Sequence, residues 1–196
     1  TVENTGGANM AVIAMLSPDG DFLWAERFWG TTDVHVPDLW VVGDRIMIRG
    51  SFKDAEVHFG NYSMSVQNDA GCPSGEANGS EPNCRAQGYL ASLSYHTGFW
   101  QWVIQDGYTY EDTATYWPYW GPVGWQFDGQ GNAYMLQRLG FDDSWWGGDG
   151  LAYCVGEICN DDPDELVVAK FDDEGDLLWN LSLTASWGSI TVNEDG

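Results

Sequence analysis

Aromatic side chains crowd one short stretch of this chain in a pattern that could bind a ligand. Residues 109–125 read TYEDTATYWPYWGPVGW, in which proline and glycine prevent one regular helical face. Flat rings beside carboxylates can stack on sugars while the acids accept hydrogen bonds from hydroxyl groups. With a second aromatic loop, SWWGGDG at 144–150, the candidate ligand-binding residues are Tyr116, Trp117, Tyr119, Trp120, Trp145 and Trp146.

Three interpretations of these aromatic residues stay open. The rings can pack beneath their own loop or against a neighbouring domain, they can stack on carbohydrate, or they can form a protein interface. The carboxylates available for sugar hydroxyls are Asp112, Asp142, Asp143 and Asp149.

Acidic turns suggest a second chemistry, the binding of calcium. The stretch DDEGD at 172–176 offers oxygen ligands from Asp172, Glu174 and Asp176, and DGQGN at 128–132 is similar. Calcium takes six to eight oxygens, and neither stretch has the full alternating spacing followed by a bidentate acid. Asp-Gly turns also close β-hairpins without a metal. Calcium is therefore the weaker expectation, and no other cofactor is expected.

Motifs for catalysis are absent from the sequence. The histidines His35, His58 and His96 are scattered, and there is no G-x-S-x-G, H-E-x-x-H or C-x-x-C pattern. Paired carboxylates are so abundant that no single pair is informative. We expect a protein without a catalytic residue; the alternative is a hydrolase whose site is shared with parts outside this chain.

The charge balance limits the partners. Thirty acidic residues stand against seven lysines and arginines, for a formal net charge of −23 over 196 residues. Such a surface repels nucleic acid and anionic membranes. No apolar run approaches the ~18–20 residues of a membrane-spanning helix, so membrane insertion is not expected. A hydrophobic content of 43% nevertheless predicts a folded core.

Cysteines and sequons favour an extracellular location. The cysteines form two close pairs, in CPSGEANGSEPNC and CVGEIC, within turn-forming sequence that is poor in histidine. Local disulfides are thus favoured over a zinc site. The cysteines concerned are Cys72, Cys84, Cys154 and Cys159. Three N-x-S sequons, the candidate glycosylation sites, are Asn61, Asn78 and Asn180. We expect a secreted or cell-surface protein.

An internal repeat predicts the fold. VIAMLSPDGDFLW (12–24), YLASLSYHTGFWQW (89–102) and VVAKFDDEGDLLW (167–179) each combine an alternating apolar run, a polar turn with glycine, and a second run that ends on tryptophan. The middle copy has one extra residue in its turn. A tryptophan that recurs once per repeat is expected to pack between adjacent sheets. The recurring residues are Trp24, Trp102 and Trp179, with Gly20, Gly98 and Gly175.

A second hairpin lies between these units, in LWVVGDRIMIRGSF and GWQFDGQGNAYMLQRLGF. Four short antiparallel strands per repeat of about 78 residues predict an all-β chain of β-propeller-like blades. Since the copies are too few to close a ring, the chain is either part of a larger propeller or completes one with other copies. We expect one all-β repeat domain over 1–196, with a partial repeat at 1–38, repeats at 39–123 and 124–188, and the first strand and turn of another at 189–196.

These repeats resemble the extracellular β-propeller repeat called the SBBP repeat. The resemblance rests on VVAKFDDEGDLLWN (167–180), VIAMLSPDGDFLWA (12–25), WQFDGQGNAYMLQRLGF (125–141) and the short element VHFGNYSM (57–64). It covers nearly the whole chain apart from the cysteine loops. It implies a part of a large secreted or surface protein, and it transfers no functional residue because the family motif is structural. The cysteine pairs and the Trp-rich stretch depart from that pattern.

The expected function is therefore a secreted or cell-surface β-propeller scaffold or recognition module. Its partner would be carbohydrate or protein, bound through the aromatic loop, since binding residues concentrate on loops held by a rigid scaffold. One alternative is a structural subunit of an extracellular filament or surface layer that self-associates through its open edges. The other is a fragment of a propeller hydrolase.

Overall fold

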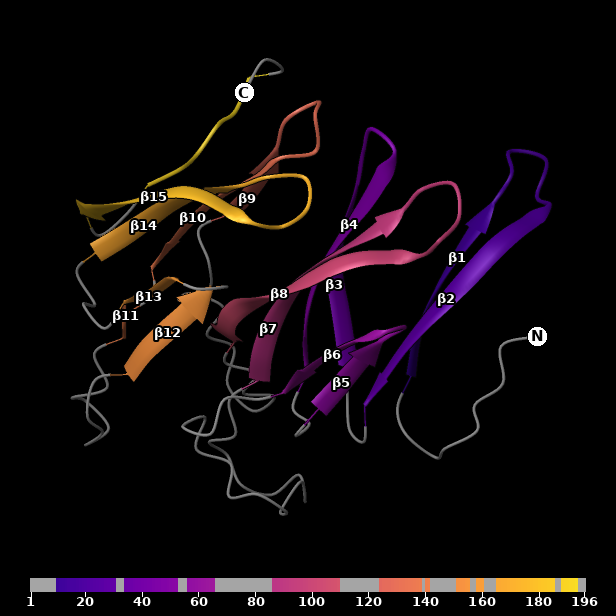
Figure 1. The fold of residues 1–196 in the computed structure, drawn as a ribbon, viewed down its shortest axis with the longest axis horizontal. Helices are drawn as coiled ribbons and strands as arrows, with labels where there is room; N and C mark the ends of the chain where they lie inside the picture. The colour runs from indigo at the N-terminus through magenta and orange to yellow at the C-terminus, as the bar shows by residue number, and fades with distance from the viewer. Residues whose placement is uncertain are drawn as a thin grey trace.

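Antiparallel β-sheets make up the structure of this chain, a computed structural model (Figure 1). It describes residues 10–30, 34–52, 56–65, 86–109, 124–138, 140–141, 151–155, 158–160, 165–185 and 188–193. Every regular element among them is a strand, so the all-β expectation is confirmed. No helix long and apolar enough to cross a membrane occurs among these residues.

The strands form three sheets. The N-terminal sheet has the order β1 (Met10–Leu16), β2 (Phe22–Gly30), β5 (Glu56–Phe59), β6 (Tyr62–Ser65). The middle sheet contains β3 (Val34–Val42), β4 (Arg45–Phe52), β7 (Ala86–Ser94) and β8 (Trp100–Thr109), and is extended beyond β8 by β12 (Leu151–Val155), β11 (Gly140–Phe141) and β13 (Ile158–Asn160). The C-terminal sheet has the order β9 (Gly124–Phe127), β10 (Ala133–Arg138), β14 (Glu165–Phe171), β15 (Leu177–Thr184).

Successive hairpins alternate between neighbouring sheets. After β2, the chain enters the middle sheet with the β3–β4 hairpin. Its strand β4 pairs with β7, from Arg45 opposite Ser94 to Phe52 opposite Gln87. The short β5–β6 hairpin then returns and pairs with β2, with Phe28 opposite Phe59. This return gives the N-terminal sheet four strands, whereas the sequence predicted only a partial repeat over 1–38.

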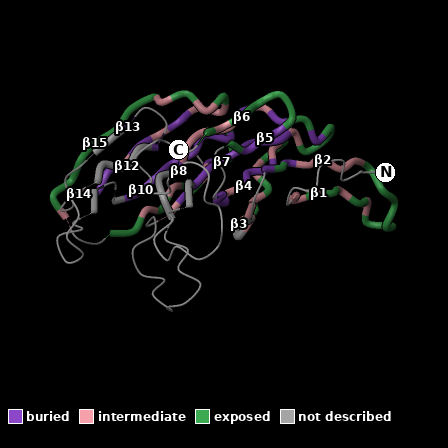
Figure 2. Tube along the Cα trace, turned by 90° about the horizontal axis from the view of Figure 1, so that it is seen from below, coloured by how far each residue is buried: buried purple, intermediate pink, exposed green. Residues whose placement is uncertain are grey.

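Side-chain alternation on the middle sheet fills the space on both of its faces. Ile46 and Ile48 of β4 belong to a buried cluster shared with the N-terminal sheet. Met47, between them, belongs to a second cluster shared with the C-terminal sheet. Because successive side chains of a strand point to opposite faces, one strand supplies both clusters. The buried residues accordingly run through the centre of the molecule, while β1 and β15 lie toward its two ends (Figures 1 and 2).

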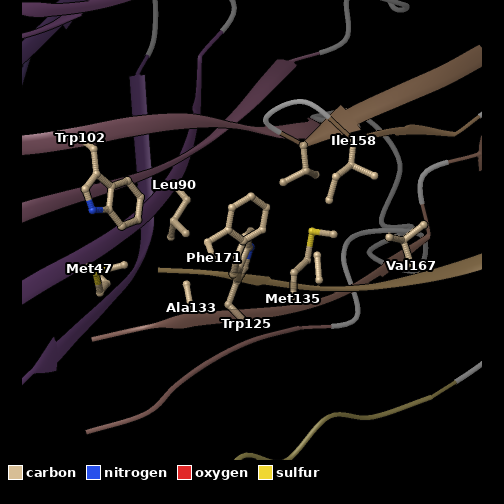
Figure 3. Close-up of a cluster of buried hydrophobic side chains, with 11 residues drawn as sticks. Met47, Leu90, Trp102, Trp125, Ala133, Met135, Ile158, Val167 and Phe171 are labelled. Carbon is tan, nitrogen blue, oxygen red and sulfur yellow. The ribbon is translucent and has the colours of Figure 1, made fainter. Parts of the chain in front are cut away.

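The second cluster shows how the sheets interlock. Leu90 and Trp102 of the middle sheet lie with Phe171 and Met135 of the C-terminal sheet (Figure 3). The rings of Phe171 and Trp125 have centroids 5.7 Å apart. Burial of each large side chain contributes roughly 1.5–3 kcal/mol to folding.

A recurring contact, which we call the Trp–turn joint, links each sheet to the next. Trp24 donates a hydrogen bond from Nε1 to the carbonyl oxygen of Tyr95, at 3.0 Å, in the β7–β8 turn. Trp102 donates in the same way to the carbonyl oxygen of Asp173, at 2.8 Å, in the β14–β15 turn. Each acceptor lies 71 residues after its donor. The repeat period of the sequence is thus the period of these joints.

Glycine is required beneath each of the two indole rings. Gly98 has φ of +75°, and a Cβ there would lie 2.6 Å from an indole carbon of Trp24. Gly175 has φ of +88°, and a Cβ there would lie 2.8 Å from an indole carbon of Trp102. Each turn therefore needs glycine for two reasons: its backbone is left-handed, and any side chain would overlap the indole ring.

The last copy of the repeat departs from the expected packing. Trp179 is 45% exposed, whereas Trp102 is 6% exposed. No further hairpin turn covers Trp179 among the described residues, so the expectation of a tryptophan between sheets holds for two of the three copies. Residues 188–193 carry no strand either, although the sequence predicted a strand and turn at 189–196. A strand needs a hydrogen-bonded neighbour, and the described part of the chain pairs none with residues 188–193.

Candidate functional site

The two strands that precede and follow the aromatic stretch in the chain are joined by a hydrogen bond between side chains. The stretch connects the end of β8 to the start of β9. Near these ends, Trp125 donates from Nε1 to Oδ1 of Asp106 at 3.1 Å, and Arg49 donates from Nε to Oδ2 of Asp106 at 2.6 Å. Asp106 is 1% exposed. This cluster of three side chains, Arg49, Asp106 and Trp125, is called the polar clamp below.

The electrostatics of the polar clamp fit an anchoring role. Burial raises the pKa of Asp106, while the Arg49 guanidinium and the hydrogen bonds from Arg49 and Trp125 oppose that shift. Both carboxylate oxygens already accept a hydrogen bond. Arg49 also lies 3.7 Å from the half-exposed carboxylate of Asp38. Asp106 is thus occupied in holding β8, β4 and β9 together, and it is closed to solvent.

The aromatic residues proposed to bind a ligand lie outside the described residues. This applies to Tyr116, Trp117, Tyr119 and Trp120, to Trp145 and Trp146, and to the neighbouring acids Asp112, Asp142, Asp143 and Asp149. Their role stays a prediction. Of the sequons, Asn61 in the β5–β6 turn and Asn180 in β15 are exposed, and Asn78 lies outside the described residues.

One of the two cysteine pairs falls on described backbone. Cys154 of β12 lies directly opposite Cys159 of β13 in the antiparallel register. Opposed residues of such a pair have Cα atoms roughly 4.5–5.5 Å apart, and disulfides span about 4.4–6.8 Å. The register is therefore compatible with the predicted local disulfide. Cys72 and Cys84 lie outside the described residues, and both disulfides stay predictions.

Asp172 and Asp173 in the β14–β15 turn form hydrogen bonds within the protein. Oδ1 of Asp172 accepts bonds from the backbone N–H groups of Glu174 and Asp176, at 3.0 and 2.8 Å. Asp173 binds Nη2 of Arg45 at 2.7 Å. The pKa of Glu174 is raised by its hydrogen bond with Asp173 and by the charges of Asp173 and Asp172. Among the described residues no three such side chains gather as a metal site, so calcium stays a prediction without a described ligand set.

The DGQGN turn uses its aspartate in the same way, but in a buried setting. Asp128 is 3% exposed and accepts four hydrogen bonds: from the backbone of Gln130 and Asn132 on Oδ1, and from the Asn132 amide and the Tyr134 hydroxyl on Oδ2. Burial would raise the pKa of Asp128, but these hydrogen bonds outweigh it, and the pKa lies below its usual range.

Replacing Asp128 by asparagine is expected to remove a pH-dependent part of the stability. A lowered pKa in the folded state stabilises the fold above the ordinary carboxyl pKa of about 3.9, and this contribution is lost as the pH falls through the folded-state pKa. The variant should unfold more easily than wild type at pH 7, by about 1–3 kcal/mol, and the difference should shrink toward pH 3. Urea unfolding at pH 7, 5 and 3 measures it, with exposed Asp21→Asn as the control for removing one charge. A difference that stays constant with pH would contradict the prediction.

Neither a family model nor a curated protein matches the chain. The site therefore stands on its geometry alone.

Sequence reasoning did not single out the polar clamp. The available signal was a charged residue inside an apolar strand pattern: Arg49 in IMIRGSF and Asp106 in WVIQDGY. Charges at such positions are seldom buried unless they are paired. The partners lie 57 residues apart, and only the register of β4, β7 and β8 brings them together.

Proposed function

We propose that this chain is a scaffold and recognition module of β-propeller type, secreted or at a cell surface and built from SBBP-like repeats. The support is the packing of three face-to-face sheets through two equivalent Trp–turn joints. A repeated joint of this kind adds blades one after another, as a propeller does. The proposal gives the chain no catalytic residue.

The ligand surface in this proposal is the aromatic stretch at 110–123. The observation that carries it is the polar clamp, in which the 3.1 Å bond between Trp125 and Asp106 joins β9 to β8, the strands that follow and precede the stretch. A loop held at a rigid base spends less conformational entropy on binding. With a net charge of −23, a neutral carbohydrate suits the surface better than an acidic polymer.

The test is binding to a panel of neutral and acidic glycans, followed by calorimetry with the best neutral one. The variant Trp117→Ala/Trp120→Ala is expected to weaken affinity at least about tenfold, roughly 1.4 kcal/mol, because tryptophans dominate such contacts. Trp29→Ala is the control, since Trp29 is a partly exposed tryptophan of the N-terminal sheet. No binding to any glycan, or equal losses in both variants, would reject carbohydrate recognition by this stretch.

A further inference from the structure

The N-terminal sheet exposes a face that is buried in both other copies of the repeat. Val12 and Leu16 of β1 are 47% and 57% exposed. In the repeat, Leu16 corresponds to Leu93 of β7 and to Phe171 of β14, which are 0% and 1% exposed. The intervening side chains of β1, including Ile13, already pack against the first buried cluster. The open face of β1 is therefore the one that packs on a preceding sheet elsewhere in the molecule.

The turn beside this face is also open. Gly20 has φ of +88°, as Gly175 does, yet a Cβ on Gly20 would meet no atom of the described residues within 4 Å. At Gly98 and Gly175 the same space is filled by an indole ring. The carbonyl of Pro18 occupies the position, two residues before the glycine, at which Asp173 accepts from Trp102. The β1–β2 turn thus has the acceptor half of a Trp–turn joint.

The C-terminal sheet exposes the donor half. Trp179 lies opposite Lys170 in the β14–β15 register, on the face away from the cluster that contains Ala169 and Phe171. Leu181 and Leu183 follow on that face, and the three side chains are 45%, 55% and 41% exposed. A Cβ on Gly188 would lie 3.2 Å from Leu136 and 3.3 Å from Leu166, so Gly188 lies over another part of this face, and Trp179 remains 45% exposed.

We propose that copies of this chain associate head to tail, with Trp179 of one copy seated on the β1–β2 turn of the next. The indole Nε1 of Trp179 would donate to the carbonyl oxygen of Pro18, and the apolar faces of β15 and β1 would close over one another. This interface continues the two joints inside the chain, whose hydrogen bonds measure 3.0 and 2.8 Å. The two halves lie on opposite end sheets (Figure 1). The association goes beyond glycan recognition and does not depend on it.

The geometry makes the interface heterologous, because one surface meets a different surface on its partner. A pair then keeps one free acceptor half on the first copy and one free donor half on the second, so association can extend beyond a pair. The net charge of −23 opposes this contact, so we expect it to strengthen as salt screens the repulsion.

The experiment measures the mass of the particle in solution over a range of protein and salt concentrations. Wild type is expected to grow beyond the 21.7 kDa chain mass with rising concentration and salt. Trp179→Glu removes the donor half, and Leu16→Glu places a charge on the apolar β1 face beside the acceptor half, so each variant alone should stay monomeric. Phe99→Asp is the control: Phe99 is 68% exposed, and the other two turns carry aspartate after their glycine.

Mixing the two variants tests whether the donor half of one copy binds the acceptor half of another. Leu16→Glu retains its Trp179, and Trp179→Glu retains its β1 face, so an equimolar mixture should form a pair and stop there. Leu181→Glu replaces Trp179→Glu if circular dichroism shows that the latter is unfolded. A wild type that stays monomeric throughout, variants that still self-associate, or a mixture that forms no pair would each overturn the proposal.

Discussion

Replacing Arg49 by methionine is expected to destabilise the protein by about 3–5 kcal/mol, because the carboxylate of Asp106 would be left buried without its cation. Asp106 is 1% exposed, and its 2.6 Å bond to Arg49 is the shortest contact of the polar clamp. A loss of this size is a large part of the ~5–15 kcal/mol that stabilises a typical domain. Urea unfolding measures it.

Asp38 offers a matched control for this prediction. It is the second acid near Arg49, at 3.7 Å, but its side chain is 45% exposed. Asp38→Asn should therefore cost less than about 1 kcal/mol. The double variant Arg49→Met/Asp106→Leu removes both buried charges and should recover much of the loss. If Asp38→Asn cost as much as Arg49→Met, the buried pair would not be what holds this region together.

The second large effect is expected at Trp102. Trp102→Ala should cost about 3–5 kcal/mol, the range for truncating a core aromatic residue. Trp102 is 6% exposed and also donates the hydrogen bond of a Trp–turn joint. The variant should additionally lose cooperativity, because the joint connects the middle and C-terminal sheets.

Trp179 provides the control within the same chain. It occupies the equivalent strand position but is 45% exposed, so Trp179→Ala should cost less than about 1 kcal/mol in dilute solution. Denaturant unfolding followed by far-ultraviolet circular dichroism compares the two variants without relying on tryptophan fluorescence. If both substitutions lowered the free energy of unfolding equally, the contact of Trp102 with the glycine turn would contribute nothing to stability.

Local signals in the sequence predicted the hairpins well. Turn glycines such as Gly98 and Gly175 need a left-handed backbone, and alternating apolar residues such as Ile46 and Ile48 identify buried strand positions. Even the extra residue of the middle turn is visible: Gly98 donates to Ser94, four residues back, where Gly20 donates to Ser17, three residues back.

The arrangement of hairpins into sheets could not be predicted in the same way. The β5–β6 hairpin has four residues per strand and joins β2 rather than its neighbours in sequence. Which strand it joins depends on the shape of the surrounding sheets, and no periodicity in the chain records that. The polar clamp was missed for the same reason, since Arg49 and Asp106 meet only across β7.

The Trp–turn joint requires only three components: a tryptophan, a backbone carbonyl and a glycine. The interval from Trp24 to Tyr95 and the interval from Trp102 to Asp173 are both 71 residues, yet their long connections fall at different places. Lengthening a loop twofold costs only about 0.6 kcal/mol in closure entropy. Mutation can therefore enlarge, shorten or rewrite the connections while the joints persist. Such a separation between fixed and free positions makes a chain evolvable, because new surfaces can be tried without risking the framework.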